Sequence, residues 1–248
     1  MAVFYQIRAH CPVRTHSRAT RLHSTHVDEA IAALRTLTEH RDDMVRTRTQ
    51  TVNRLHVLMT KLVPAGLPRK HTADAPCAAS TQKTPLARTL RGLATELIAE
   101  IRRLDRRIAT STEQITTAVA ASGTTLTELH GIGDLLAAKV LTRTADVDRF
   151  RSAAAFASYC GVAPLEVSSG DVQRHRLPRA GDRQLNSALH VMAITQIRHD
   201  TAGQAYYQRK RGEGKGHKEA LRCLKRRLAD VVYRTTLRDG DTSLTSAT

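Results

Sequence analysis

The sequence predicts a mainly α-helical protein in which a long coiled-coil arm precedes a compact helical domain. Three observations predict this fold class. Only 3% of the 248 residues are aromatic and the apolar residues are mostly Ala, Leu, Val and Ile, which favours helix packing over a β-sandwich. Two long stretches repeat apolar residues with a spacing of seven. Shorter amphipathic segments follow them, separated by glycine-bearing turns.

The N-terminal third contains one long predicted helix. Residues 1–26 are basic and His-rich without periodicity, and we expect them to be poorly ordered. A helix is predicted over 27–63, with apolar rows such as Leu34, Leu55 and Leu62, although Arg41 and Arg48 interrupt one row. The prolines of "PAGLP" end this helix, and the Pro-, Ala-, Ser- and Thr-rich residues 64–84 are typical of a linker.

A second long helix is predicted over residues 85–122. Leu90, Leu97 and Leu104 lie seven apart, and a companion row begins at Ala94 and runs to Ile115. Two such helices joined by a linker indicate a helical hairpin or a coiled-coil arm that pairs two chains. An ordinary two-helix core element would show the same pattern.

A compact C-terminal domain is predicted over residues 123–238, after the break at "SGTT". The segment "TELHGIGDLLAAKVLTRT" predicts a helix, a tight turn and a helix, and "RSAAAFASYCG" predicts a helix closed by Gly161. Residues 162–178 contain few helix formers and indicate a loop or short strand. Amphipathic helices follow over 182–199 and 218–238, and we expect the tail 239–248 to be frayed.

The charge of the chain argues for a polyanionic partner. The net charge is +16, and 31 of the 39 basic residues are arginine, which grips phosphate with two parallel hydrogen bonds. Codon bias in a GC-rich genome would explain the arginine preference but not the excess of charge. Residues 171–238 alone carry 12 arginines and 4 lysines against 6 acidic residues. We therefore predict a phosphate-binding surface that includes Lys225 and Arg226.

Other classes of protein fit the sequence poorly. The four cysteines lie more than 60 residues apart, without the spacing of a zinc site or a disulfide framework. No apolar run has the length of a membrane span, and the N-terminus lacks the apolar core of a signal peptide. We expect a cytoplasmic protein with reduced thiols and no membrane partner.

The stretch "LHGIGDLLAAKVL" resembles the turn of a helix-hairpin-helix. Gly131 and Gly133 permit a tight turn, after which the amides at a helix start could meet a phosphate, with Lys139 further along. The same glycines could equally serve a turn that only packs two helices together.

The stretch "SSGDVQRHRLPRAGDR" brings serines close to arginines. A serine hydroxyl becomes a nucleophile when a base removes its proton, and attack on a phosphodiester needs cations around the phosphate oxygens. Serines before a glycine are also common in polar turns, so spacing alone leaves both interpretations open. The candidate residues of this stretch are Ser168, Ser169, Arg174, Arg176, Arg179 and Arg183.

The sequence from Leu126 to Arg238 closely resembles the C-terminal domain of the DEDD-type transposases of the insertion-sequence-one-ten family, bridge-RNA-guided recombinases. The residues that carry the resemblance are "LTELHGIGDLLAAKVL", "RFRSAAAFASYCGVAPLEVSSGDVQRHRLPRAGDRQLNSALH" and the basic segments after them. Residues 27–122 are similar to the middle region of that family.

The resemblance implies roles for several residues and partners. It implies that Ser169, with Ser168 as the second choice, is a nucleophile that forms a phosphoserine intermediate with DNA. It implies that Arg174, Arg176 and Arg179 contact DNA or guide RNA near the scissile phosphate. It further implies a structured guide RNA, and a homo-oligomer joined through the coiled-coil arm.

The resemblance also implies a divalent metal, Mg²⁺, held by four acidic residues of an N-terminal RuvC-like domain. Asp28, Glu29, Asp42 and Asp43 lie after the region of those acids, so none of them takes over the metal role. We therefore expect a truncated copy with no bound cofactor that does not cleave plasmid DNA alone. The alternatives are a non-catalytic remnant that binds DNA or RNA and an unrelated helix-hairpin-helix module.

Overall fold

The computed structural model describes residues 29–62, 84–169, 172–176 and 181–245, and the two strands are described by their backbone and register. These residues are mainly helical, as predicted. None of their helices has the uninterrupted apolar length that crossing a bilayer requires. The elements are α1 (Glu29–Leu62), α3 (Pro85–Ala121), the 3-10 turn η1 (Leu126–Glu128), α4 (Asp134–Thr144), α5 (Ala153–Tyr159), β1 (Leu165–Ser169), β2 (Val172–Arg176), α6 (Arg183–Arg198), α7 (Ala202–Gly212) and α8 (His217–Thr245).

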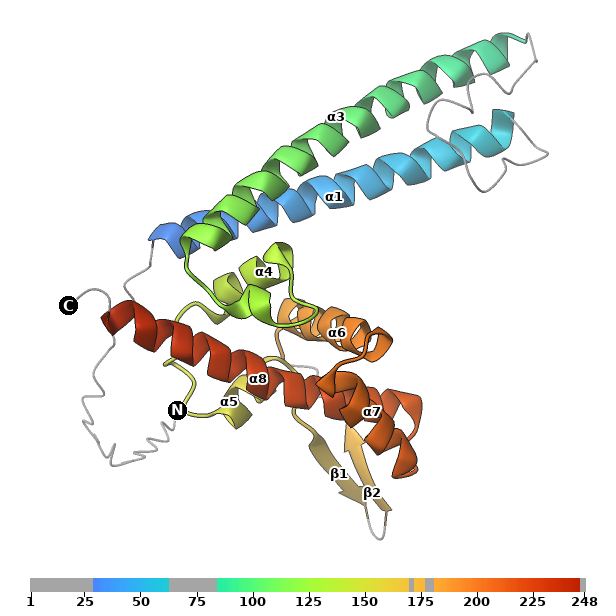
Figure 1. The fold of residues 1–248 in the computed structure, drawn as a ribbon. Helices are drawn as coiled ribbons and strands as arrows, with labels where there is room; N and C mark the ends of the chain where they lie inside the picture. The colour runs from blue at the N-terminus through green and yellow to red at the C-terminus, as the bar shows by residue number, and fades with distance from the viewer. Residues whose placement is uncertain (1–28, 63–83, 170–171, 177–180, 246–248) are drawn as a thin grey trace, which may run out of the picture.

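Helices α1 and α3 lie side by side and antiparallel, and they form an arm that extends away from the rest of the molecule (Figure 1). Apolar side chains of both helices are buried between them, because each helix presents its seven-residue rows to the other. The N-terminus of α3 is capped by Thr84, whose hydroxyl accepts from the Ala87 amide, and Pro85 occupies the first turn. The buried cluster of the outer arm consists of Leu55, Met59, Leu62, Ala87, Leu90, Ala94, Ile98 and Ile101.

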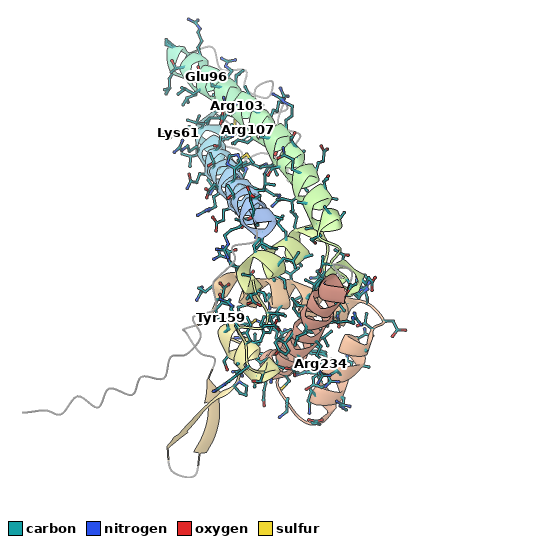
Figure 2. The ribbon with its side chains drawn as sticks, turned by 90° about the vertical axis from the view of Figure 1, so that its left-hand side faces the viewer. Lys61, Glu96, Arg103, Arg107, Tyr159 and Arg234 are labelled. Carbon is teal, nitrogen blue, oxygen red and sulfur yellow. The ribbon has the colours of Figure 1, made fainter. Side chains whose placement is uncertain are left out.

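The arginines that interrupt the apolar row of α1 find polar partners on α3. Arg41 Nε donates to Thr112 Oγ1 at 2.8 Å, and Arg48 forms an ion pair with Asp105. The imperfect row therefore still pairs with α3, since its charged members reach the edge of the interface. Figure 2 shows other basic side chains of the arm, including Arg103 and Arg107, on its outside.

The base of the arm packs on the C-terminal domain through α4 (Figure 1). Leu34 of α1 belongs to the same buried cluster as Leu126 and Ile132. An ion pair of 2.8 Å joins Lys139 Nζ of α4 to Asp42 Oδ2 of α1. The N-terminal part of α1 therefore belongs to the core of the C-terminal domain as well as to the arm.

The C-terminal domain buries one apolar core between α4, α5, α6, α7 and α8. Phe156, Leu185 and Met192 are almost completely buried in it, together with Leu224 of α8. Tyr233 of α8 donates its hydroxyl to the Phe150 carbonyl at 3.0 Å, which ties α8 to the segment before α5. This packing holds the segments that lead into and out of the two strands in one domain.

Two elements differ from the sequence-based expectation. The first predicted helix of the glycine-bearing turn is only the 3-10 turn η1, because Gly123 and Gly131 both have positive φ and leave room for a single turn between them. Helix α8 continues to Thr245 instead of ending near 238. Asp239 fixes this extension, since its carboxylate accepts from Thr124 Oγ1 at 2.8 Å and from the Thr125 amide at 3.0 Å.

Candidate nucleic-acid interface

The serine stretch forms a β-hairpin that projects from the domain on the side opposite the arm (Figure 1). Its strands pair antiparallel from Leu165 opposite Arg176 to Ser169 opposite Val172. Ser169 therefore closes the ladder next to the turn, whose residues 170 and 171 lie outside the described residues. The expected loop or short strand is thus a two-stranded ribbon with Ser169 near its tip.

The register separates the two serines onto opposite faces of the ribbon. Directly paired residues share a face, and the faces alternate along each strand. Ser169 therefore lies on the face of Arg174 and Arg176, whereas Ser168 lies on the face of His175. Arg174 follows the Ser169 pair by two residues, a rise of about 7 Å along the strand. The hairpin thus aligns Ser169, and not Ser168, with the two arginines.

The two ends of the hairpin segment cross at a pair of glycines. Gly161, with φ +67°, lies so close to Gly181 that a Cβ added at Gly181 would overlap the Cα and N of Gly161. Beside this crossing, the Asp182 amide donates to the Tyr159 carbonyl at 2.7 Å. Asp182 also caps α6, because its carboxylate accepts from the Gln184 and Leu185 amides. The hairpin therefore enters and leaves the domain at one tightly packed point.

An asparagine of α6 and a lysine of α8 stabilise this crossing of Gly161 and Gly181. Asn186 of α6 donates through Nδ2 to the Cys160 carbonyl at 3.1 Å and to the Gly161 carbonyl at 2.9 Å. Lys225 of α8 donates to Asn186 Oδ1 at 2.6 Å. We call Asn186 and Lys225 the hairpin clamp. Nothing in the pattern of α6 set Asn186 apart, because its partners come from segments distant in the sequence.

The structure corrects the expected position of Lys225. Its side chain is only 7% exposed, so it does not lie on the phosphate-binding surface on which the sequence analysis placed it. Burial lowers the pKa of Lys225, and the Cys160 thiol opposes this shift. The ammonium group of Lys225 ends at Asn186 Oδ1, beside the glycine crossing.

The neighbouring thiol of Cys160 is buried and stays protonated. Cys160 is completely buried, and this burial, with the negative charge of Asp182, raises the pKa of the thiol to about 12. Lys225 acts in the opposite direction but does not offset burial. Because the thiolate is the reactive form, Cys160 is a packing residue of the crossing.

The turn at Gly131 and Gly133 packs against α6. Gly131 has φ +90°, and an added Cβ would lie 3.1 Å from the Met192 carbonyl oxygen. The first turn of α4 carries Asp134, which accepts from Thr116, and Lys139 is paired with Asp42. These contacts give Gly131 and Lys139 a packing role, whereas nothing lies within 4 Å of a Cβ added at Gly133. Their binding of phosphate stays a prediction.

The remaining predicted cations lie in three different environments. Arg183 is exposed at the start of α6, and Arg226 forms an ion pair with Asp230. Arg179 lies outside the described residues. Arg209 and Arg227 belong to the basic C-terminal segments of the sequence but were not among the predicted site residues. Both are exposed and, within the described ranges, neither takes part in an ion pair.

The metal implied by the resemblance finds no ligand set in the described part of the chain. No group of three His, Cys, Asp or Glu residues there lies close enough together to hold an ion. Asp42, one of the acids near the arm base, is instead paired with Lys139. The described residues therefore do not fit a Mg²⁺ site, and we derive no chemical step through a metal.

Comparison with known proteins shows which proteins this chain is similar to. Residues 123–208 match the model of the transposase IS116/IS110/IS902 family. The uncharacterised protein of insertion element IS110 from Streptomyces coelicolor is 40% identical over 46% of this chain and 28% of its own length. The uncharacterised protein of IS116 from Streptomyces clavuligerus is 27% identical over 85% of this chain and 65% of its own length.

A third relative carries a more explicit description. A probable family 20 transposase from Pseudomonas aeruginosa is 28% identical over 63% of this chain and 48% of its own length. The chain thus spans between about a quarter and two thirds of the curated relatives it matches.

Proposed function

We propose that this chain, whose residues 123–208 carry the domain of the IS116/IS110/IS902 transposase family, acts in DNA transposition by binding DNA and presenting Ser169 to a phosphodiester. The observation that carries the proposal is the hairpin register. It puts Ser169 at the end of the ladder on the same face as Arg174 and Arg176.

The proposed chemistry is nucleophilic attack by a serine oxygen. The oxygen forms a bond to phosphorus, the bond from phosphorus to one neighbouring sugar oxygen breaks, and that sugar oxygen gains a proton. The serine proton passes to a base. Charge builds up on the phosphate oxygens during this step, and arginines on the same face would stabilise it. The hairpin clamp supports this role because it fixes the base of the ribbon.

Binding to DNA is proposed to rest on phosphate contacts. Exposed arginines without ion pairs in the described ranges, such as Arg183 and Arg227, supply positive charge on the surface of the C-terminal domain. The proposal also retains Gly131, Gly133 and Lys139 as a helix-hairpin-helix phosphate contact, which would require Lys139 to leave Asp42. A structured guide RNA is a further proposed ligand of the same basic surface.

Self-association through the arm is part of the same proposal. Leu86 and Leu93 lie seven residues apart on α3 and are 68% and 44% exposed, although both are large apolar residues. Val57 of α1 is 56% exposed. An apolar row left outside the α1 and α3 interface is what a coiled-coil contact with a second copy needs.

A covalent-adduct assay tests the proposed chemistry. The chain is incubated with Mg²⁺, a structured RNA transcribed from its element and plasmid DNA carrying the element ends, and protein that stays bound to DNA in denaturant is then sought. An adduct lost in Ser169→Ala and retained in Ser168→Ala supports nucleophilic catalysis. An adduct that persists in Ser169→Ala contradicts it.

The second candidate function is binding of nucleic acid without strand cleavage. The observation that favours it is that no group of metal-binding residues lies together in the described part of the chain. Salt-sensitive DNA binding by the wild type, with no adduct under any of these conditions, supports this candidate over the first.

A further inference from the structure

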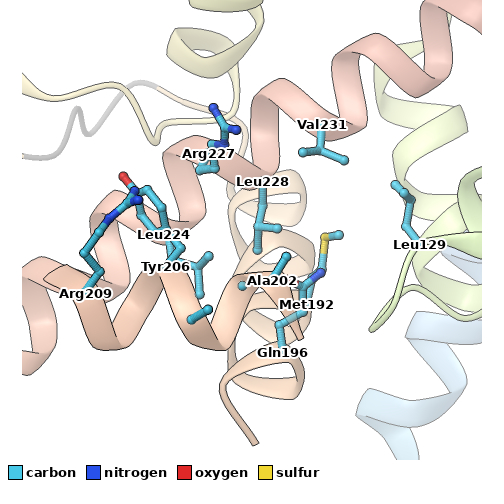
Figure 3. A pocket seen from close by; sticks show the side chains of 12 residues that line it. Leu129, Met192, Gln196, Ala202, Tyr206, Arg209, Leu224, Arg227, Leu228 and Val231 are labelled. Carbon is cyan, nitrogen blue, oxygen red and sulfur yellow. The ribbon is translucent and has the colours of Figure 1, made fainter. Parts of the chain in front are cut away.

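A groove of 670 Å³ lies between α6, α7 and α8 (Figure 3). Aliphatic side chains form much of its lining, and the volume lies within the range of roughly 300–1,000 Å³ found for small-ligand sites. The apolar residues of the lining are Leu129, Met192, Ala202, Ala205, Leu224, Leu228 and Val231.

Two arginines stand beside this apolar lining. Arg209 of α7 lies over the ring of Tyr206, with 5.0 Å between its guanidinium carbon and the ring centroid. Arg227 of α8 extends from the neighbouring helix (Figure 3). Among the described residues neither arginine forms an ion pair, whereas Lys210 and Arg226, next to them in sequence, are paired with Glu213 and Asp230. The groove therefore combines an apolar lining with two arginines that form no ion pair among the described residues, although Arg209 is near enough to Glu213 to help lower the pKa of that carboxyl.

This combination selects for an anion attached to a flat apolar group. An acidic peptide would bring polar backbone groups against the aliphatic lining, where they lose hydrogen bonds to water. The Gln196 amide nitrogen, one of the polar groups of the lining, already donates to the His130 carbonyl at 2.9 Å. A nucleotide base instead offers an apolar face, and it also stacks on a guanidinium plane such as that of Arg209.

We propose that this groove binds one unpaired nucleotide of a DNA strand. The base packs on the aliphatic lining and on Arg209, while Arg209 and Arg227 bind the flanking phosphates. We propose DNA as the strand because residues 123–208 match the model of a transposase family. The inference rests on the proposed function, since it takes DNA as the substrate.

Fluorescence anisotropy with a short single DNA strand, the matching duplex and the matching RNA strand tests the groove. Ala205→Phe fills the lining without changing charge, and Arg227→Gln removes one cation. Arg234→Gln is the matched control, because Arg234 is exposed on the same helix but does not line the groove (Figure 2).

We expect Ala205→Phe to weaken single-strand DNA binding about tenfold, as the loss of one stacked base predicts, and to leave duplex binding unchanged. Arg227→Gln should weaken single-strand binding and reduce its salt slope by about 0.7. Arg234→Gln should weaken single-strand and duplex binding equally. If Ala205→Phe lowers the melting temperature, the single-strand and duplex affinities of Arg209→Gln and Arg227→Gln are compared instead.

Three results would overturn the inference. They are an unchanged single-strand affinity in Ala205→Phe and Arg227→Gln, an equal loss of duplex binding in Ala205→Phe, and RNA binding that is tighter than DNA binding and equally sensitive to Ala205→Phe. Competition by a polyglutamate peptide that is lost in the same variants would assign the groove to a protein partner instead. Wild-type protein that binds no nucleic acid refutes the proposed function itself, whereas normal binding in the groove variants refutes the groove alone.

Discussion

Asn186 and Lys225 form a small polar network whose members depend on one another. Asn186 holds two carbonyl oxygens at the end of α5, and Lys225 holds the remaining side-chain oxygen of Asn186. A buried charge is costly unless it is hydrogen-bonded, so the loss of stability depends on which of the two partners is removed. Removing Asn186 leaves an ammonium group and two carbonyls without this partner, whereas removing the lysine also removes the buried charge.

The hairpin clamp predicts unequal effects of two substitutions on stability. Asn186→Ala should lower the free energy of unfolding by about 3–5 kcal/mol, because a buried charge loses its partner. Lys225→Met should lower it by about 1–3 kcal/mol, since one hydrogen bond is lost while similar volume is kept. Urea unfolding measures both. Lys218→Met is the matched control, because Lys218 is exposed and should tolerate the change within about 0.5 kcal/mol. Equal losses in the two clamp variants would contradict the proposed network.

Cys160 predicts a pH dependence of stability. The pKa of its thiol is about 12 in the folded chain, against 9.0 for a free thiol, so in this range the unfolded chain loses the proton first. The stabilisation is complete below pH 9 and is lost as pH rises from about 9 to 12. The free energy of unfolding of the wild type should therefore fall more steeply with pH in this range than that of Cys160→Ala, by up to about 1.4 kcal/mol per pH unit. Parallel pH profiles would show that Cys160 is not shielded from water.

At the scale of elements, the hairpin depends on the contact between Gly161 and Gly181 more than on its own two strands. Two-stranded ribbons are marginal by themselves, so the ribbon takes its orientation from the point where it joins the domain. That point is a backbone crossing with no room for a side chain at Gly181.

Gly181→Ala should therefore displace the hairpin or destabilise the domain. Its Cβ would overlap backbone atoms, which cannot move as a flexible side chain does, and we expect a loss of at least about 2 kcal/mol in the free energy of unfolding. Gly92→Ala is the control, because nothing lies within 4 Å of an added Cβ in α3 and alanine favours the helix. Urea denaturation of both variants gives the comparison, and a neutral effect of Gly181→Ala would refute the close crossing.

The elements also show what the sequence alone could predict. Seven-residue spacing locates α1 and α3, because helix periodicity is a local signal. The predicted end of α8 was wrong, since "DGD" is typical of a turn unless the contact of Asp239 with Thr124 and Thr125 is known. The pairing of Ser169 with Val172 could not be predicted to the residue, because the length of the turn sets the register of a hairpin and the sequence alone did not show where the strands end. Asn186 and the burial of Lys225 were missed because their partners are distant in the chain.

At the scale of the whole molecule, the arm and the hairpin lie at opposite ends of one continuous structure (Figure 1). The arm base shares the core cluster of the domain through Leu34 and is also joined to α4 by the ion pair of Lys139 and Asp42. An oligomer formed through the outer arm would therefore set the distance and orientation between two hairpins. This geometry suits a protein that acts on two DNA segments.

The exposed row of the arm predicts a change in assembly without a change in folding. Leu86→Lys with Leu93→Lys should shift the chain toward monomer in sedimentation, because the lysines remove the apolar surface that a second copy would cover. The melting temperature should stay within the error of the wild type, since both side chains lie outside the α1 and α3 interface. Thr110→Lys, on an exposed position of α3 outside the row, is the control and should leave sedimentation unchanged. Unchanged sedimentation of the double variant would exclude this row as the contact.

The central claim is that the hairpin places Ser169 at a DNA phosphate, and disulfide trapping tests it most directly. Ser169→Cys is mixed with duplexes in which a thiol is tethered to one backbone phosphate at a time across the element ends. The account predicts a protein–DNA disulfide at a narrow set of phosphates for Ser169→Cys, and little trapping for Ser168→Cys, which lies on the opposite face of the ribbon. The wild type reports the background of the native cysteines. Equal trapping of both variants, or trapping of neither by DNA that the chain binds, would contradict the claim.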